Sequence, residues 1–559
     1  MRTIAVKNKY TIGNHFRFRN NTFRLDKQSV SWLKEIGVFN AFPSLSIDEE
    51  GAIPLSLSYD ATLLQDGYRI DTRKGEIDLY YSNVRSLFYA LDTLLQHLTP
   101  KGNAFQIPSM VIEDDPSQAI RGIIEGYYGT PWTFEERMTL PLFMTKHRLN
   151  AYMYGPKSDP YHRLQWRDPY PPELFNELST FFQSLTKYSI TPWFCLSPSY
   201  SHKGSIPIQY SSETDFQLLM NKYFAFYDQG IRHFGLFYDD IDALLSPQDT
   251  QVFHRVGIAH AKLANRVYQE LSAKQDPIAL VMCPTEYHEL ADSIYRQDLR
   301  SHLHPDIHVF FTGDNVCAEA ITAHDLHRAN QQFGRKVMIW DNFPVSDFTY
   351  GVREFPSVIE NRSTHMGELT TGYFINPSIH FEISKIGMIS MALYAWNSEG
   401  YDSKQAYALC FDEVDERLLA LGGAFFEHNR QSILSDEALI REQQRFEIFK
   451  KQPILAYYDA LEMACQNLLA LQTPFIAECT PWLKRALKEV WIARGSFDST
   501  LTRDHILSFL EDIHFSGSQL IDRIIQETKQ LTEKEIEELI TNRRGRQWYR
   551  VFEAKRWLK

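Results

Sequence analysis

Two adjacent aspartates, Asp239 and Asp240, are the residues whose type and spacing point most directly to chemistry. They follow the apolar run Phe234–Tyr238, which places them at the end of a predicted buried strand. Repulsion and desolvation are expected to raise the pKa of at least one carboxyl group in such a pair. One protonated and one ionised carboxyl group are what acid-assisted cleavage of a glycosidic bond requires.

Two other interpretations of the aspartate pair remain open. The dipeptide is also typical of a solvated turn or a helix N-cap. A metal site is a further alternative, but His302, His304 and His308 belong to a stretch that enters a predicted strand. We interpret them as surface and strand-end histidines, and we expect no metal and no cofactor.

Polar and aromatic residues also follow most of the other apolar runs of the central region. They lie in the segments Glu125-Gly-Tyr-Tyr-Gly-Thr-Pro-Trp132, Gly155-Pro-Lys-Ser-Asp159, Pro284-Thr-Glu-Tyr287, Trp340-Asp-Asn342 with Asp347 beyond it, and Asn376-Pro377. Loops that leave the carboxyl ends of parallel barrel strands meet on one rim. The sequence therefore predicts one site that draws on several loops.

The elements that must position these loops are eight short apolar runs separated by amphipathic stretches. The runs are Gly122–Glu125, Asn150–Tyr154, Pro192–Ser197, His233–Tyr238, Ile278–Cys283, His308–Phe311, Lys336–Trp340 and Gly372–Ile375. Continuous apolar runs that alternate with helices are typical of buried parallel strands. We predict a (β/α)8 TIM barrel over residues 117–410. A doubly wound open sheet is the alternative, although no GxGxxG or P-loop motif supports it.

Residues 1–116 mix strand and helix patterns and predict a small α+β domain. Ile77–Tyr81 reads as a strand, and Ser82 as the cap of a helix that follows it. The helix carries an apolar stripe formed by Val84, Leu87, Leu91, Leu94, Leu95 and Leu98. The acidic segment Glu113–Pro116 is predicted to be a linker to the barrel.

Residues 411–559 lack strand patterns and predict an α-helical domain. Apolar residues keep helical spacing at Leu461, Ala464, Leu468 and Leu471, and again at Ile506, Phe509, Leu510 and Ile513. Thr532 and Glu535 form a candidate capping box ahead of a further apolar stripe at Ile536, Leu539 and Ile540. These stripes suggest homodimerisation through the C-terminal helices as a hypothesis.

Composition limits the classes of partner and the compartment. The chain has 559 residues, 44% of them hydrophobic, and is therefore expected to fold into several domains. Its net charge of −12 argues against a role in binding nucleic acid. The six cysteines show no CxxC pair, and the N-terminus has no apolar signal segment, so we expect a cytoplasmic protein without a membrane partner.

The motifs of the central region resemble those of glycoside hydrolase family 84, the O-GlcNAcases and related bacterial β-N-acetylglucosaminidases. The likeness covers the whole predicted barrel, in order and with compatible spacing, and it rests on Glu125-Gly-Tyr-Tyr-Gly-Thr-Pro-Trp132, Tyr154-Gly-Pro-Lys157, Phe237-Tyr-Asp-Asp-Ile-Asp242, Cys283-Pro-Thr-Glu-Tyr287, Trp340-Asp-Asn342 and Ile375-Asn-Pro377. The segment from Gly67 to Leu98 also resembles the small domain that precedes such barrels in bacterial members.

The resemblance implies retaining exo-hydrolysis of a terminal β-linked N-acetylglucosamine (GlcNAc). The acetamido oxygen of the sugar attacks its own C1 and forms an oxazoline, an exception to the usual two-carboxylate scheme. By the same resemblance, Asp239 orients the acetamido N–H, Asp240 is general acid and then general base, and Tyr287 binds the acetamido oxygen. The resemblance also assigns sugar hydroxyls to Lys157, Asn342, Asp347, Asn376 and the backbone of Gly126, with Trp340 as a wall of the pocket.

Two of these assignments have a plainer alternative. Without the resemblance, Lys157 reads equally as a surface lysine and Trp340 as barrel packing, and Cys283 is expected to line the pocket rather than to act as a nucleophile. The chain departs from the family at Phe311, where relatives carry Trp, and it has Tyr127 and Tyr238 where Phe is usual. These changes are expected to alter pocket polarity or aglycone preference. We also expect one sugar-sized rim to be lined by aromatic residues, namely Tyr127, Tyr128, Trp132, Tyr287 and Trp340.

The predicted substrate is a glycoprotein or oligosaccharide that bears β-GlcNAc. Two other functions remain open. One is a catalytically silent protein that binds GlcNAc or a glycoprotein, and the other is an endo-hexosaminidase of the hyaluronidase type.

Overall fold

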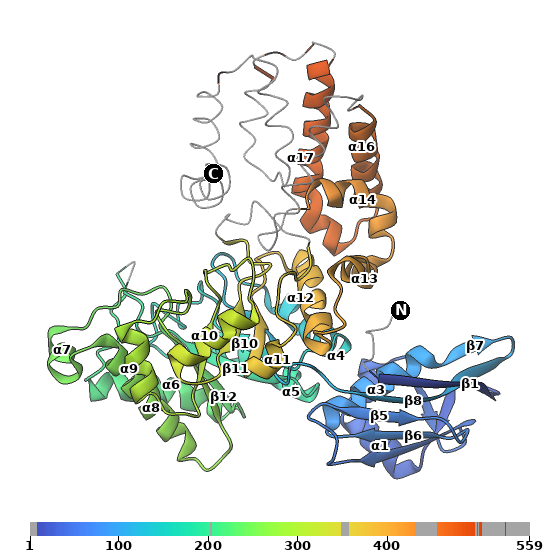
Figure 1. The fold of residues 1–559 in the computed structure, drawn as a ribbon, viewed down its shortest axis with the longest axis horizontal. Helices are drawn as coiled ribbons and strands as arrows, with labels where there is room; N and C mark the ends of the chain where they lie inside the picture. Colours follow the sequence, from blue (N-terminus) through green and yellow to red (C-terminus); the bar gives the residue numbers. More distant parts are fainter. Residues whose placement is uncertain are drawn as a thin grey trace.

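A computed structural model describes residues 8–201, 204–347, 357–430 and 455–497, together with residues 500, 502, 504, 505 and 532. Three parts follow one another along the chain. An N-terminal α/β domain lies beside a central barrel, and C-terminal helices rise from the barrel (Figure 1). The predicted order of fold types is therefore confirmed, while the domain boundaries at residues 116 and 410 stay predictions.

The N-terminal domain is built on one mixed sheet that helices cover. The strand order is β1-β8-β5-β6-β4-β2-β3, with β7 paired to β8. The strands are β1 Asn8–Phe18, β2 Thr22–Arg24, β3 Ser46–Asp48, β4 Ile53–Tyr59, β5 Tyr68–Asp71, β6 Ile77–Tyr81, β7 Thr99–Lys101 and β8 Ala104–Asp114. The helices are α1 Lys27–Glu35, α2 Val38–Ala41 and α3 Val84–His97.

The strand and helix predicted after residue 76 are present as β6 and α3, but the predicted cap is wrong. Asn83, not Ser82, is the N-cap: its side chain accepts from the backbone N–H of Ser86, and the Ser86 hydroxyl receives the N–H of Asn83 in return. Leu87, Leu91 and Leu94 are fully buried against the sheet, as their spacing predicts.

The predicted linker is also wrong, because Glu113 and Asp114 belong to strand β8. Asp114 is only 1% exposed. Its carboxylate accepts hydrogen bonds from Tyr68 at 3.0 Å and from the indole N–H of Trp396 at 3.0 Å. In a sequence, an acidic residue in a Pro-containing stretch suggests exposure to solvent. Here Asp114 is buried and joins the sheet to the last helix of the barrel.

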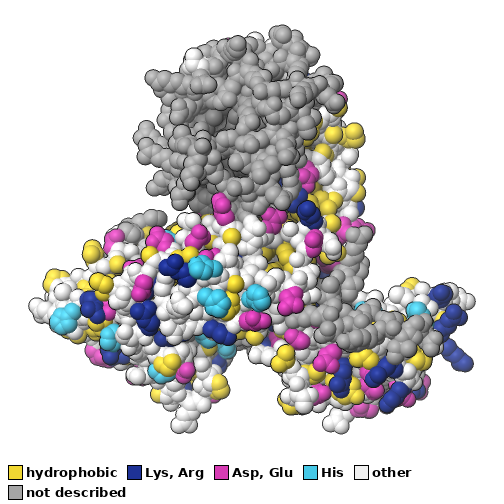
Figure 2. All heavy atoms as spheres, in the orientation of Figure 1, with side chains coloured by type: hydrophobic (Ala, Val, Ile, Leu, Met, Phe, Trp, Pro, Cys, Tyr) yellow, Lys and Arg dark blue, Asp and Glu magenta, His cyan; other side chains and the backbone are white. Residues whose placement is uncertain are grey.

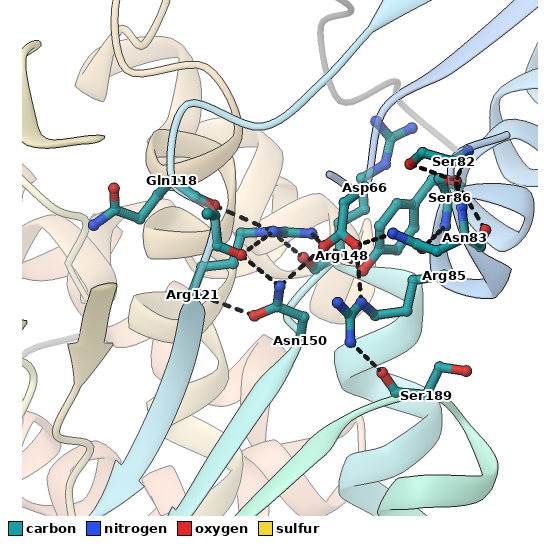
Figure 3. Close-up of polar contacts among 12 residues, drawn as sticks. Asp66, Ser82, Asn83, Arg85, Ser86, Gln118, Arg121, Arg148, Asn150 and Ser189 are labelled. Carbon is teal, nitrogen blue, oxygen red and sulfur yellow. Dashed lines mark hydrogen bonds and ion pairs between the residues drawn. The ribbon is translucent and has the colours of Figure 1, made fainter. Parts of the chain in front are cut away.

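A buried polar network joins the N-terminal domain to the barrel (Figure 3). Asp66 is fully buried and accepts from Arg121, which begins a barrel strand, at 3.0 Å and from Asn150, which precedes the next strand, at 2.9 Å. Arg85 of α3 donates to Asp66 at 2.9 Å and to the Ser189 carbonyl at 3.2 Å. One charged residue of the barrel, Arg121, and two of the small domain, Asp66 and Arg85, thus have polar partners across the boundary between the two parts.

The central region is a closed parallel barrel with the strand order β10-β11-β12-β13-β14-β15-β16-β9. The strands are β9 Arg121–Glu125, β10 Ala151–Tyr154, β11 Thr191–Leu196, β12 His233–Phe237, β13 Ala279–Cys283, β14 His308–Phe311, β15 Met338–Asp341 and β16 Gly372–Ile375. Each of the eight predicted apolar runs forms one strand. Closure between β16 and β9 rules out the doubly wound open sheet.

Helices surround the barrel, and the strands lie between two hydrophobic layers, one inside the barrel and one beneath the helices. They are α4 Phe134–Lys146, α5 Pro172–Lys187, α6 Glu213–Tyr227, α7 Pro247–Phe253, α8 Val256–Ser272, α9 Ile294–His302, α10 Ala323–Phe333, α11 Met366–Leu369 and α12 Phe381–Trp396. Along each strand, side chains alternate between the barrel interior and the helix layer. Phe237 and Phe310 pack in the interior, whereas Tyr238 and Phe311 pack among the helices.

The C-terminal helices pack on the barrel through their own hydrophobic core. They are α13 Ser403–Asp415, α14 Leu418–His428, α16 Leu455–Leu469 and α17 Pro474–Phe497. Leu461, Ala464 and Leu468 are buried in this core, as their spacing predicts, and Leu471 follows the end of α16. Homodimerisation stays a prediction. The predicted helical stripe at Ile506, Phe509, Leu510 and Ile513 and the capping box of Thr532 and Glu535 ahead of Ile536, Leu539 and Ile540 lie outside the described residues, apart from Thr532 itself.

The surface charges and the helix lengths are relevant to the expectation that neither nucleic acid nor a membrane is a partner. On the face shown in Figure 2, acidic and basic side chains are interspersed over the barrel. Within the ranges that the structure describes, every helix is too short or too polar to cross a membrane. The expectation that the protein does not bind nucleic acid rests on its net charge of −12.

Candidate active site

A pocket opens at the carboxyl ends of the barrel strands, and loops that follow every strand except β11 line it. All the predicted site residues line this pocket, and so does Cys283. The lining residues are Gly126, Tyr128, Lys157, Asp239, Asp240, Cys283, Tyr287, Thr312, Val316, Cys317, Trp340, Asn342, Val345, Asp347 and Asn376. The convergence of loops expected from the barrel thus brings the predicted residues together.

Asp239 is the buried carboxylate of the aspartate pair, with 4% of its surface exposed. Its Oδ2 receives a hydrogen bond from the ammonium group of Lys157, itself 8% exposed. Its Oδ1 is buried and has no hydrogen-bond partner among the described residues. One oxygen of Asp239 is therefore held by the protein, and the other is an unused acceptor in the wall of the pocket.

The sequence predicts a raised pKa for at least one carboxyl group of the pair, but at Asp239 the shift is downward. Burial alone raises its pKa, but the positive charges of Lys157 and Arg163 outweigh burial and hold the pKa below its ordinary value of 3.8. The sequence gives no sign of this because Lys157 and Arg163 lie in the loop after β10, far from Asp239 along the chain. Asp239 is therefore ionised at neutral pH.

Asp240 is in a different environment from its neighbour, because it is exposed and held by two tyrosines. Its Oδ2 accepts from the Tyr128 hydroxyl at 2.7 Å, and its Oδ1 accepts from the Tyr287 hydroxyl at 2.9 Å. Its φ of 54° lies in the left-handed region that few residues other than glycine adopt. This turn directs the two adjacent carboxyl groups into separate surroundings.

Both tyrosines are hydrogen-bond donors to Asp240. Burial, and after it the negative charge of Asp240, raises the pKa of Tyr128 and of Tyr287 above the ordinary value of 10.0. The two hydroxyls therefore keep their protons at neutral pH. In this structure they satisfy both oxygens of an accepting carboxylate.

Trp340 lines the pocket together with two asparagines. Its indole N–H donates to Oδ1 of Asn342 at 2.8 Å, and the same oxygen accepts from the Asn376 amide at 2.8 Å. Oδ1 of Asn376 accepts from the backbone N–H of Gly126 at 3.2 Å. A side chain at Gly126 would place its Cβ 2.4 Å from the Trp340 ring, so only glycine allows the ring to lie there.

Asp347 and Lys157 complete the polar lining. Oδ2 of Asp347 accepts from the backbone N–H of Tyr128 at 2.9 Å, which ties the loop after β15 to the loop after β9. The ammonium group of Lys157 lies 5.1 Å from the Trp340 ring centroid and 5.5 Å from that of Phe237. Lys157 is thus a buried residue of the pocket and not a surface lysine.

Some lining residues were not predicted as site residues. For Tyr128, which stands two positions after Gly126 in the same motif, the sequence predicts only a place among the rim aromatics. Thr312, Val316, Cys317 and Val345 carry no pattern that distinguishes them from other loop residues. Burial raises the pKa of the Cys283 and Cys317 thiols, so both are protonated at neutral pH and are poor nucleophiles.

Four residues expected to affect the pocket do not line it. Tyr238 and Phe311 point outward into the helix layer, and Tyr127 and Trp132 are buried side chains of the loop that follows β9. The Tyr127 hydroxyl accepts from the backbone N–H of Trp132 at 3.1 Å and lies 3.4 Å from Glu125. The extra hydroxyl at Tyr127 therefore supports the loop that carries Tyr128 and does not change pocket polarity.

No group of three or more His, Cys, Asp or Glu residues within the described ranges is arranged to hold a metal ion. The pocket instead offers carboxylates, amides, an ammonium group and an indole face. This set of groups suits a neutral, hydroxyl-rich ligand such as a sugar.

Two family models match the chain. A model described as beta-N-acetylglucosaminidase matches residues 121–424, and one described as glycosyl hydrolase family 20, domain 2, matches residues 7–115. The first of them covers more than half of the 559 residues, including all eight barrel strands.

The chain is also similar to curated and structurally solved proteins. The rat (Rattus norvegicus) and mouse (Mus musculus) proteins named Protein O-GlcNAcase are 30% identical over 279 residues, which are 49% of this chain and 29% of theirs. A mutant of the Thermobaculum terrenum O-GlcNAc hydrolase is 25% identical, with a TM-score of 0.66 over 76% of this chain and 96% of that one.

A further solved structure shares the fold over nearly the whole length. CpGH84B has a TM-score of 0.78 over 94% of this chain and 100% of its own, at 21% identity. With the barrel and its pocket in place, the match over residues 121–424 shows that the chain belongs to the β-N-acetylglucosaminidase family, glycoside hydrolase family 84.

Proposed function

We propose that this protein is a retaining exo-β-N-acetylglucosaminidase that removes terminal β-linked GlcNAc with the help of the substrate's own acetamido group. Membership of the family supports the reaction class. The observation that carries the mechanism is Oδ1 of Asp239, a buried acceptor without a partner among the described residues, on a carboxylate whose other oxygen is held by Lys157. A buried acceptor is costly to leave unsatisfied, and the acetamido N–H of a bound GlcNAc supplies the missing donor.

In this mechanism Asp239 orients the acetamido group and does not attack the sugar. The low pKa of Asp239 keeps it ionised, so it stabilises the positive charge that develops on the acetamido nitrogen as its oxygen bonds to C1. Its ion pair with Lys157 fixes its position and reduces its strength as a nucleophile. Tyr287 donates to the acetamido oxygen and holds it near C1.

Asp240 transfers the protons in both steps. In the first step it gives a proton to the leaving oxygen while the bond from C1 to that oxygen breaks and the oxazoline forms. In the second step the Asp240 carboxylate takes a proton from water, whose oxygen bonds to C1 on the face that the leaving group vacated. The bond between C1 and the acetamido oxygen breaks as the bond to water forms, which restores the acetamido group with net retention at C1.

The remaining lining residues hold the sugar ring. We assign the ring hydroxyls to Lys157, Asn342, Asp347, Asn376 and the backbone of Gly126, with the face of Trp340 as the apolar wall. The two asparagines bond to each other and to Trp340 in this structure, so they are already oriented before a sugar arrives.

A GlcNAc-bearing glycoprotein is the substrate class that we propose. The relatives named Protein O-GlcNAcase and O-GlcNAc hydrolase support it, although the matched region is only 29% of the length of the mammalian proteins. All six cysteines are free thiols, which supports a reducing compartment such as the cytoplasm.

The test is release of 4-nitrophenol from 4-nitrophenyl β-GlcNAc, with 4-nitrophenyl β-glucoside as the control that lacks the acetamido group. We expect turnover of the first substrate, none of the second, and inhibition by a GlcNAc-thiazoline. Tight binding of the thiazoline without turnover would establish the silent binding protein instead. Release of oligosaccharides from hyaluronan without action on the aryl glycoside would favour an endo-hexosaminidase.

A further inference from the structure

Arg163 is a buried cation at the edge of the active site, and the proposed mechanism uses it only through the effect of its charge on Asp239. It lies six residues after Lys157 in the loop after β10 and is 1% exposed. Its Nη1 donates to the Tyr128 hydroxyl at 3.0 Å, and its guanidinium lies 3.9 Å from the Tyr200 ring centroid. Its Nε and Nη2 are buried without a hydrogen-bond partner among the described residues.

Arg167, four residues further along the same loop, shows what a structural arginine looks like here. Its guanidinium makes two hydrogen bonds to Asp215, at 2.8 and 2.6 Å, and two more to the carbonyls of Ile206 and Pro207. Arg163 has no such carboxylate within ion-pair distance in the described ranges. A buried charge left with so few partners opposes stability, so a structural role alone does not account for it.

The charge of Arg163 is balanced instead by the active site. Burial lowers its pKa, but Asp239 and then Tyr128 outweigh burial and raise the pKa above the ordinary value, so the guanidinium stays charged. The neighbouring His162 is neutral, because burial lowers its pKa to about 3. The remaining titratable groups around the guanidinium are Lys157, Tyr200 and Asp240, from three different loops.

The hydrogen bonds run in one direction, from Arg163 to Tyr128 and from Tyr128 to Asp240. The Tyr128 hydroxyl has one proton and donates it to Oδ2 of Asp240 at 2.7 Å. It must therefore accept, not donate, in its bond with the Arg163 guanidinium. A hydroxyl that accepts from a cation is polarised and becomes a stronger donor to the next acceptor.

We propose that Arg163 is a positioning residue that acts through Tyr128 to stabilise the Asp240 carboxylate left behind when the leaving group takes its proton. The inference rests on the proposed function. Negative charge appears on Asp240 as the proton moves to the leaving oxygen. The polarised Tyr128 hydroxyl stabilises that charge through its hydrogen bond to Oδ2. The contribution is largest for poor leaving groups, because these need the most complete proton transfer.

The test combines Arg163→Met and Tyr128→Phe, singly and together, on two β-GlcNAc glycosides. One carries 4-nitrophenol, which leaves readily, and the other an alkyl alcohol, which leaves poorly. We expect each single variant to lower kcat for the alkyl glycoside about tenfold, with a much smaller loss on the aryl glycoside and little change in KM. Arg163→Lys, which keeps the charge, should recover part of the loss.

The double variant separates this role from a structural one. If Arg163 acts through Tyr128, Arg163→Met adds little to the loss already present in the Tyr128→Phe protein. Arg167→Met is the matched control, and it should affect thermal stability without selectivity between leaving groups. Tyr128→Phe keeps the half-exposed ring, so it should fold even where Arg163→Met does not.

Two results would overturn the inference while leaving the proposed function intact. One is a Tyr128→Phe variant that loses activity equally on both glycosides, and the other is a loss from Arg163→Met that is the same with and without the Tyr128 hydroxyl. An unmodified protein that turns over neither glycoside would overturn the proposed function itself, and this inference with it.

Discussion

The hydroxyl of Tyr287 donates a hydrogen bond to Oδ1 of Asp240 at 2.9 Å, although its proposed task is to hold the acetamido oxygen of the substrate. One hydroxyl has one proton to donate, so Tyr287 must exchange partners when GlcNAc binds. The exchange frees Oδ1 of Asp240 to carry the proton that the leaving group requires. Substrate binding and preparation of the acid are thereby linked through one residue.

Tyr287→Phe removes this donor and should lower kcat/KM for 4-nitrophenyl β-GlcNAc about ten- to a hundredfold. The lost hydrogen bond both orients the acetamido oxygen and prepares Asp240, and one bond to a charged group accounts for a change of that size. Steady-state kinetics give the value, with Tyr268→Phe, whose hydroxyl lies 3.3 Å from Asp306 on the surface, as control. A change within twofold in both variants would contradict the role of Tyr287.

The two aspartates should respond differently to the leaving group. Asp240→Ala should lower kcat about a hundredfold or more for alkyl β-GlcNAc glycosides and far less for activated aryl glycosides, which need little protonation. Asp239→Asn should lower both about alike, because attack by the acetamido oxygen accompanies the departure of either leaving group. Rate constants over a series of leaving groups measure the difference. Equal losses from Asp240→Ala across the series would reverse the assignment of the acid.

Lys157→Met should move the acid limb of the pH profile of kcat/KM to higher pH. Burial raises the pKa of Asp239, but Lys157 and Arg163 hold it below 3.8, so activity that needs the carboxylate is present at 3.8 and above and is lost as the pH falls through this lowered pKa. Without the Lys157 charge the limb should rise by about one unit or more. Lys146→Met, which breaks a more exposed pair with Glu413, should leave the limb in place. An unshifted limb in Lys157→Met would rule out this electrostatic role.

Asp66→Ala should destabilise the protein by about 3–5 kcal/mol, because it leaves Arg121 buried without its carboxylate. Burial raises the pKa of Asp66, but Arg121 and Arg85 lower it to about 2, against an ordinary value of 3.8. The stabilisation is therefore fully present above the ordinary value and is lost as the pH falls towards 2. Denaturant unfolding from neutral to acid pH measures it. Asp71→Ala, at a more exposed pair with Arg73, is the control and should change little. Equal stability losses in the two variants would contradict this account.

The barrel was predictable because each strand is buried on both faces. Such strands read as short apolar runs, as in Phe234–Tyr238, and closure then brings their loops together at one rim. This is why residues as distant in sequence as Gly126 and Asn376 could be assigned to one pocket. Their bond at 3.2 Å follows from the topology and not from any local pattern.

Contacts between loops could not be predicted in the same way. The ion pair of Lys157 with Asp239 reverses the pKa shift expected from burial, and the bond of Tyr128 to Asp240 joins loops more than a hundred residues apart. The direction of a side chain at a strand end is equally hidden. Phe311 points outward because its neighbour Phe310 points into the barrel, and the apolar run they share looks the same in either register.

The central claim is that the acetamido oxygen of the substrate is the nucleophile. It is tested most directly with 4-nitrophenyl β-glycosides whose N-acetyl group carries zero, one, two or three fluorine atoms, because fluorine withdraws electrons from that oxygen without changing the leaving group. We predict that kcat/KM falls steeply and continuously as fluorine is added. A rate that is independent of fluorination would show that a protein group attacks C1 and would contradict the claim.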